Sequence, residues 1–157
     1  MQKRIVICGS MSTYKEMIKI KKYLKRFCIE AIIPEDDSSL TEQLFKQKNT
    51  RDEYKRKLSK MHMTKIRDPK TQSILIINSD KYGIKNYIGA NSFAEIAIAF
   101  IQNKRIFLLY DFPDMYYDEL SAWKVIPLKG DIDILVRRFK TNKSSQYMLP
   151  GIINSNE

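Results

Sequence analysis

Cysteine and histidine are scarce in this chain of 157 residues, which has two cysteines and one histidine. Cys8 and Cys28 cannot form a disulfide framework, and with only His62 beside them they give little basis for a zinc site. Cys8 ends an apolar run and Cys28 falls on the apolar face of an expected helix, so we expect both thiols in the core. No metal and no cofactor is expected.

Long hydrophobic runs are also absent. No stretch approaches the roughly 18 apolar residues of a membrane span, which argues against a membrane-spanning protein. An apolar run follows the basic N-terminus at residues 5–8, but it is too short and too β-branched for a signal peptide. We therefore expect a cytoplasmic protein.

The glycine-rich patterns of common nucleotide-binding folds are missing as well. Gly9-Ser10-Met11-Ser12 matches neither the dinucleotide fingerprint nor the phosphate loop of ATPases, so ATP and dinucleotides have little support. Its serines and backbone amides could still hold a sugar or a phosphate. The chain shows no aromatic-interleaved motif of a DNA- or RNA-binding module, and nucleic acid is not expected as a partner.

Positive charge is abundant but unevenly placed. The net charge is +10, and residues 41–70 carry ten Lys and Arg against four Asp and Glu. Residues 71–136 carry six against eight, so the second half is close to neutral. This distribution suits attraction of phosphate-bearing ligands, although a solvated basic helix face explains it equally well.

Apolar runs alternate with amphipathic segments along the chain, whose length suits one domain. We expect strands at residues 4–8, 30–33, 73–78, 105–110 and 123–128, with Pro127 confining the last to an edge. We expect helices at residues 14–28, 41–60, 92–103 and 131–139. The α/β domain spans residues 1–140, and residues 141–157 form a polar C-terminal tail.

Strands that alternate with helices predict a mostly parallel sheet with helices on both faces. A five-stranded, three-layer flavodoxin- or Rossmann-like fold with strand order 2-1-3-4-5 is the simplest arrangement. Ligands of such sheets bind beyond the carboxyl ends of the strands. That rule selects three segments: Gly9 to Ser12, Asn78 to Asp80, and Tyr110-Asp111.

The loop that follows the third strand leads into an apolar helix through Gly89, Asn91 and Ser92. Free backbone amides at a helix start favour an anion or a polar sugar. Glu95 lies one turn further and could face the same crevice. The spacing Ser92-x-x-Glu95 is also that of a capping box, in which the glutamate bonds the backbone of the serine, and spacing alone favours this structural interpretation.

Residues 89–99, Gly-Ala-Asn-Ser-Phe-Ala-Glu-Ile-Ala-Ile-Ala, resemble the Gly-Thr-x-x-Glu helix start of the nucleoside 2-deoxyribosyltransferase-like superfamily. The strand at residues 74–78 and the run at residues 104–109 are similar to the flanking segments of that family. The layout agrees over residues 3–136, although the specific motif is short. Phosphoribohydrolases share some likeness, but their motif requires one more glycine.

The resemblance implies that Glu95 is the catalytic nucleophile, which attacks the anomeric carbon of a nucleoside or nucleotide. The strand-end rule and the free amides of the helix start make Gly9, Ser10, Gly89, Asn91 and Ser92 candidate substrate contacts. Asn78 and Asp80 are the nearest candidates to handle the base or the leaving nitrogen. Many family members have an aspartate six residues before the glutamate, where this chain has Gly89. Transfer of the deoxyribosyl group to a second base is therefore less supported than hydrolysis.

Two functions stay open from the residues alone: an N-glycosidic-bond enzyme, and a non-catalytic nucleotide-sensing or interaction module on the same fold. The Glu95 side chain distinguishes them. A position in a cleft beside Gly9 and Asn78 favours the enzyme, whereas a side chain that folds back onto Ser92 favours the module.

Three further features have two interpretations each. His62 is expected at a surface or helix end rather than in catalysis. Lys81, Tyr82 and Lys85 could contact a 5′-phosphate or simply be solvated, and residues 111–117 could form a lid or pack at a subunit contact.

The helix at residues 92–103 is apolar on nearly every face, and one sheet face can bury only one side of it. We therefore expect a homo-oligomer, most simply a two-fold dimer, in which a second subunit covers this helix.

Overall fold

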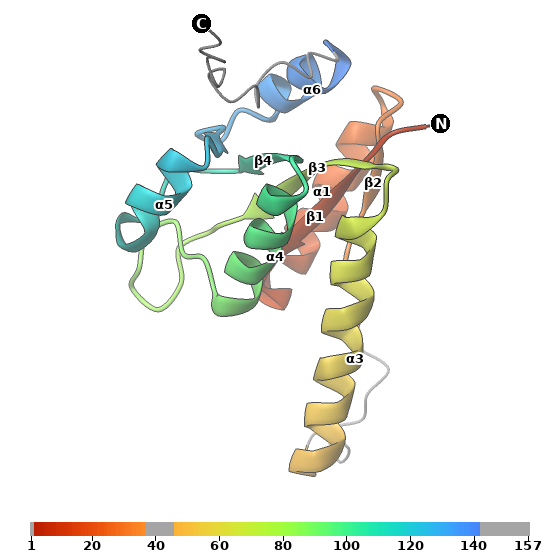
Figure 1. The fold of residues 1–157 in the computed structure, drawn as a ribbon, viewed down its shortest axis with the longest axis vertical. Helices are drawn as coiled ribbons and strands as arrows, with labels where there is room; N and C mark the ends of the chain where they lie inside the picture. The colour runs from red at the N-terminus through yellow and green to blue at the C-terminus, as the bar shows by residue number, and fades with distance from the viewer. Residues whose placement is uncertain (1, 37–45, 142–157) are drawn as a thin grey trace, which may run out of the picture.

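The computed structural model describes residues 2–36 and 46–141, and a five-stranded sheet forms its centre (Figure 1). The strands are β1 (Arg4–Gly9), β2 (Glu30–Ile32), β3 (Thr71–Ile77), β4 (Arg105–Leu108) and β5 (Ile126–Pro127). Their order is β2-β1-β3-β4-β5, and each neighbouring pair is parallel. The predicted fold class and strand order are confirmed.

Helices cover both faces of the sheet. On one face lie α1 (Tyr14–Lys25) and α6 (Ile132–Lys140); on the other lie α3 (Lys48–Arg67), α4 (Ala90–Ile101) and α5 (Tyr117–Ala122). Short 3-10 turns, η1 (Met11–Thr13) and η2 (Asp114–Tyr116), precede α1 and α5. None of the helices within the described ranges is long and apolar enough to span a membrane.

Strand β1 shows how the sheet separates two cores. Ile5 and Ile7 pack among the residues of α1 and α6, whereas Val6 and Cys8 pack among those of α3 and α4. All four side chains are fully buried. A run of apolar residues without polar alternation is what a parallel sheet covered on both faces requires.

Helix α3 lies further along the chain than expected. Its predicted start at residues 41–45 lies outside the described residues, and the helix continues to Arg67 instead of ending at Lys60. No helix breaker occurs before Pro69, and the fully buried Ile66 anchors the last turn against the sheet. The first half of α3 projects well beyond the sheet (Figure 1).

The expected helix at residues 14–28 ends at Lys25, which changes the position of one thiol. Cys28 has a φ of +58° and is exposed, so the expectation that it lies in the core was wrong. Cys8 is buried, as expected. Except for Thr141, the expected tail at residues 141–157 lies outside the described residues.

The region after β4 departs most from the predicted elements. The expected strand at residues 105–110 ends at Leu108, and that at 123–128 shortens to β5, which pairs with β4 alone. The edge position inferred from Pro127 is confirmed. Helix α5, which the sequence patterns did not reveal, lies between these strands.

Aromatic side chains around α5 cover part of α4. Phe93 lies 4.6 Å from Tyr116 between ring centroids, and Phe100 stacks on Trp123 at 4.7 Å. The chain itself therefore covers part of the face of α4 that we expected a second subunit to cover. In the segment at residues 111–117, Tyr116 takes part in this packing, whereas Met115 and Tyr117 are exposed. Ile101, at the end of α4, remains 75 % exposed.

Candidate functional site

Two adjoining cavities open at the carboxyl edge of the sheet, where β1 and β3 end and α4 begins. The larger has a volume of about 740 Å³ and the smaller about 380 Å³. We call the larger one the lysine cavity, since its lining includes Lys15, Lys19, Lys55 and Lys81. We call the smaller one, lined by Glu95, the Glu95 cavity. Both are lined by Gly9, Ser10, Lys55 and Asn91.

Glu95 lies in the second turn of α4 with only 2 % of its surface exposed. The N-cap of α4 is Gly89, so the helix starts two residues earlier than predicted and Ser92 lies inside its first turn. Glu95 Oε1 instead accepts a hydrogen bond from Asn91 Nδ2 at 3.1 Å. The capping-box interpretation was wrong, and the carboxyl group faces a cavity beside Gly9.

Asn91 connects this carboxyl group to α3. Its Oδ1 accepts from the Ser59 hydroxyl at 3.3 Å while its Nδ2 donates to Glu95. One amide thus bridges two helices and orients the buried carboxyl group. Asn91 also lines both cavities, which keeps it within reach of a ligand.

Burial dominates the electrostatics of Glu95. Loss of solvation raises the pKa of Glu95 from 4.5 to about 7, and hydrogen bonds from Cys8 and Asn91 oppose this rise. The carboxyl group therefore changes its charge near neutral pH. A carboxyl group with such a pKa in a cleft is characteristic of functional sites.

His62 and Glu95 line the Glu95 cavity, and the fully buried Cys8 lies beside them, outside its lining. One potential ligand atom of each lies within 4.8 Å of those of the other two, and all three residues are buried. They come from β1, α3 and α4, which are distant in sequence. The fold thus assembles a thiol, an imidazole and a carboxyl group that the sequence positions did not connect.

His62 is only 6 % exposed, so the expectation of a surface or helix-end position was wrong. Its Nε2 lies 3.1 Å from the Ile7 carbonyl oxygen and 4.0 Å from Glu95 Oε1. Burial first, and the charge of Lys65 second, lower the pKa of His62 to about 4. The imidazole is therefore neutral at neutral pH, and its contact with Glu95 is not an ion pair.

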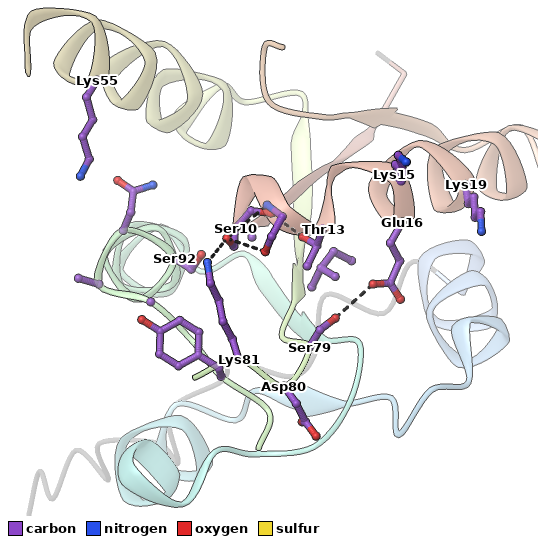
Figure 2. Close-up of a pocket in the computed structure, with 17 residues that line it drawn as sticks. Ser10, Thr13, Lys15, Glu16, Lys19, Lys55, Ser79, Asp80, Lys81 and Ser92 are labelled. Atoms are coloured by element: carbon purple, nitrogen blue, oxygen red, sulfur yellow. Dashed lines mark hydrogen bonds between the residues drawn. The ribbon is translucent and has the colours of Figure 1, made fainter. Parts of the chain in front are cut away.

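The lysine cavity presents hydroxyl and ammonium groups to a ligand (Figure 2). Lys81 Nζ donates to Ser10 Oγ at 2.7 Å, and the Ser12 hydroxyl donates to the same oxygen at 3.0 Å. Lys55 projects from α3 on the side opposite Lys81 (Figure 2). Ala90, Asn91 and Ser92 add the amino-terminal turn of α4 to the lining. Such a set of donors suits an anion.

The loop between β3 and α4 is held in shape by its own bonds. Lys81 and Ile84 exchange two backbone hydrogen bonds around Tyr82 and Gly83, which both have positive φ. The Asp80 carboxylate accepts from the Asn86 amide at 2.9 Å. Asp80 lines the lysine cavity and at the same time braces this loop.

The remaining predicted site residues divide into two groups. Gly9 and Ser10 line both cavities, and Gly89 and Ser92 line the lysine cavity. Asn78 lines neither: it is fully buried, donates to the Asp111 carbonyl and accepts from the Tyr110 amide. Its carboxamide joins the ends of β3 and β4 in the interior of the protein, so it does not reach a base in either cavity.

A β-carbon on Gly9 would lie 3.0 Å from the Ile77 carbonyl oxygen and 3.0 Å from Met17 Cε. The close approach of β1 to β3 therefore requires glycine at this position. Gly89 differs, since a β-carbon there would make only ordinary contacts with Tyr87.

Comparison of the chain with protein-family models, with curated proteins and with solved structures finds no match. The geometry of the two cavities and the residues that line them therefore carry the functional argument.

Proposed function

We propose that the protein is an N-glycosidic-bond enzyme that acts on a nucleotide, with Glu95 as the nucleophile. The observation that carries this proposal is the buried Glu95 carboxyl group, which lines a cavity directly beside a second cavity rich in lysine and serine. Substrate sites of small molecules have volumes of about 300–1,000 Å³, and both cavities fall within that range.

The chemistry of each cavity suggests how a nucleotide would lie. Tyr54, Leu58 and Met61 of α3 line the Glu95 cavity and offer apolar surface to a base. Ser10, Ser12 and Lys81 line the lysine cavity and suit a 5′-phosphate. The sugar would then lie between them, beside Asn91 and Glu95.

In this arrangement the Glu95 carboxylate attacks the anomeric carbon as the bond to the base nitrogen breaks. The base leaves with the bonding electrons and takes up a proton from solvent. Water then attacks the same carbon, which releases the carboxylate and leaves a sugar with a free hydroxyl group. Hydrolysis is preferred to transfer, because Gly89 supplies no carboxylate at the position where the resembling family has one.

The decisive experiment incubates the purified protein with a panel of nucleosides and their 5′-monophosphates and measures free base by chromatography. We expect base release from at least one monophosphate. Binding of a monophosphate without any release would contradict the enzyme and favour a nucleotide-sensing module.

Two broader expectations belong to the same proposal. A two-fold dimer would cover the exposed Ile101 at the end of α4, and sedimentation would detect it. A cytoplasmic location agrees with nucleotide metabolism, and fractionation of cells would test it.

A further inference from the structure

The cluster of Cys8, His62 and Glu95 contains three different metal-binding groups at one point. Cys8 lies in β1, His62 in α3 and Glu95 in α4, so three elements fix their positions. Their potential ligand atoms all lie within 4.8 Å of one another. Tetrahedral zinc, with bonds of about 2.0–2.3 Å, places its ligand atoms roughly 3.5 Å apart, so a contraction of about 1 Å suffices.

One nitrogen of the buried His62 imidazole has no hydrogen-bond partner in the part of the chain that the structure describes. This nitrogen is Nδ1. Nε2 lies 4.0 Å from Glu95 Oε1 and 3.1 Å from the Ile7 carbonyl oxygen, so an ion bound at Nε2 would replace the contact with Ile7. A buried polar atom without a partner is rare in folded proteins and calls for an explanation. A neutral imidazole is also the form that binds metals.

We propose that Cys8, His62 and Glu95 bind one divalent cation of the zinc type. Thiolate and imidazole ligands select zinc and related transition metals over magnesium or calcium. Three protein ligands leave the fourth coordination position of the ion free, and this position would open to the Glu95 cavity. Zinc sites that bind small molecules have the same arrangement.

The positive surroundings do not prevent this binding. Arg51, Lys55 and Lys65 line the Glu95 cavity, with Glu35 as a second acidic group beside Glu95. A thiolate and a carboxylate together carry two negative charges, which a divalent ion balances, so the occupied cluster is neutral.

Binding of the ion would occupy the Glu95 carboxylate. If Glu95 is the nucleophile, as the proposed function holds, zinc inhibits base release and a chelator restores it. Only this consequence rests on the proposed function; the binding itself does not.

The test uses cobalt as a visible substitute for zinc. Protein freed of metal with a chelator is titrated with Co²⁺, and we expect one ion per chain with the near-ultraviolet absorption of a cobalt–thiolate bond. Cys8→Ser should abolish that absorption. Loss of a residue that only hydrogen-bonds to a metal ligand weakens binding by roughly 10–100-fold. His62→Gln removes a ligand itself, so it should weaken cobalt binding by more than that.

Cys28→Asn is the matched control, because it removes the exposed thiol and asparagine tolerates the positive φ at this position. It should keep the absorption. Lack of cobalt absorption in the wild-type protein would overturn the proposal, and so would absorption that persists in Cys8→Ser or disappears in Cys28→Asn.

Circular dichroism of each variant verifies its fold. Should Cys8→Ser not fold, His62→Gln decides, and unchanged cobalt affinity in that variant would overturn the site. Cobalt absorption requires no substrate, so base release without cobalt binding rejects only the metal site. Cobalt binding, together with no base release by the chelator-treated protein, rejects only the enzyme.

Discussion

The two faces of the sheet hold cores of different chemistry, although the same strands build both. Beneath α1 and α6, near the carboxyl ends of β1, β3 and β4, lie the apolar side chains of Ile7, Ile77 and Leu109. Beneath α3 and α4, at the same edge, lie Cys8, His62 and Glu95. Burial of an ionisable group lowers the free energy of unfolding unless an ion pair or hydrogen bonds compensate for its lost solvation. The reactive groups on the second face therefore reduce the stability of the fold.

The largest effect on activity should come from Glu95, the buried acidic group that only the second face contains. Glu95→Gln keeps the size and the hydrogen bond from Asn91 but removes the negative charge, so base release should fall by at least about 1,000-fold. Chromatography of released base measures it. Glu119→Gln, on the exposed side of α5, is the control and should retain full activity. Equal activity of the two variants would remove Glu95 from the mechanism.

The rate of base release should depend on pH through Glu95, the buried acidic group of the second face. The nucleophile must be ionised, and the pKa of Glu95 is raised to about 7. With a chelator present, the rate should fall about tenfold for each pH unit below that value and reach a plateau above it. A rate limited by an ordinary glutamate would instead stay level down to about pH 5.

Stability should move in opposite directions on the two faces. Leu24→Ala, in the apolar core beneath α1, should lower the free energy of unfolding by about 2–5 kcal/mol. Glu95→Gln should raise it by up to about 3 kcal/mol near pH 8, because the buried carboxylate no longer has to ionise. Urea unfolding measures both.

The sign of the second change follows from linkage. The pKa of Glu95 is higher in the folded protein than its ordinary 4.5, so the folded state binds the proton more tightly. The stabilisation that the protonated Glu95 gives the folded state is complete below about pH 4.5 and disappears as the pH rises through 7. The gain in Glu95→Gln should therefore vanish near pH 4. A gain that persists there would point to packing rather than charge.

The sequence predicted the fold well because local patterns determine it. The apolar runs of β1 and β3 and the alternation with helices suffice for the topology. The carboxyl-edge rule selects Gly9 and Ser10, and the free amides of a helix start point to the beginning of α4. Helix ends were less predictable. Ser92-x-x-Glu95 has the spacing of a capping box whether the helix starts at residue 90 or 93, and only the position of Gly89 as N-cap decides.

The cluster around Glu95 was missed because it is a tertiary contact. Leu58, His62 and Ile66 recur at four-residue spacing, and this periodicity could have placed His62 on the inner face of α3. Nothing local connects that face to Cys8. Asn78 was misassigned for a related reason, since a buried carboxamide that joins two strand ends has the same sequence context as one that faces a ligand.

The smallest effect should come from the lysine cavity, whose groups are only partly buried. Lys81→Gln keeps a donor near Ser10 Oγ but removes a charge, so kcat/KM for a 5′-monophosphate should fall about tenfold, the size expected for one charge-assisted hydrogen bond. The free nucleoside should be unaffected. Lys70→Gln, exposed where β3 begins and so at the opposite edge of the sheet, is the control. Added salt should also lower kcat/KM for the monophosphate and not for the nucleoside, because screening weakens the attraction between the lysines and the phosphate. If Lys81→Gln lowers activity on both substrates alike, the lysine shapes the loop around Ser10 and the phosphate binds elsewhere.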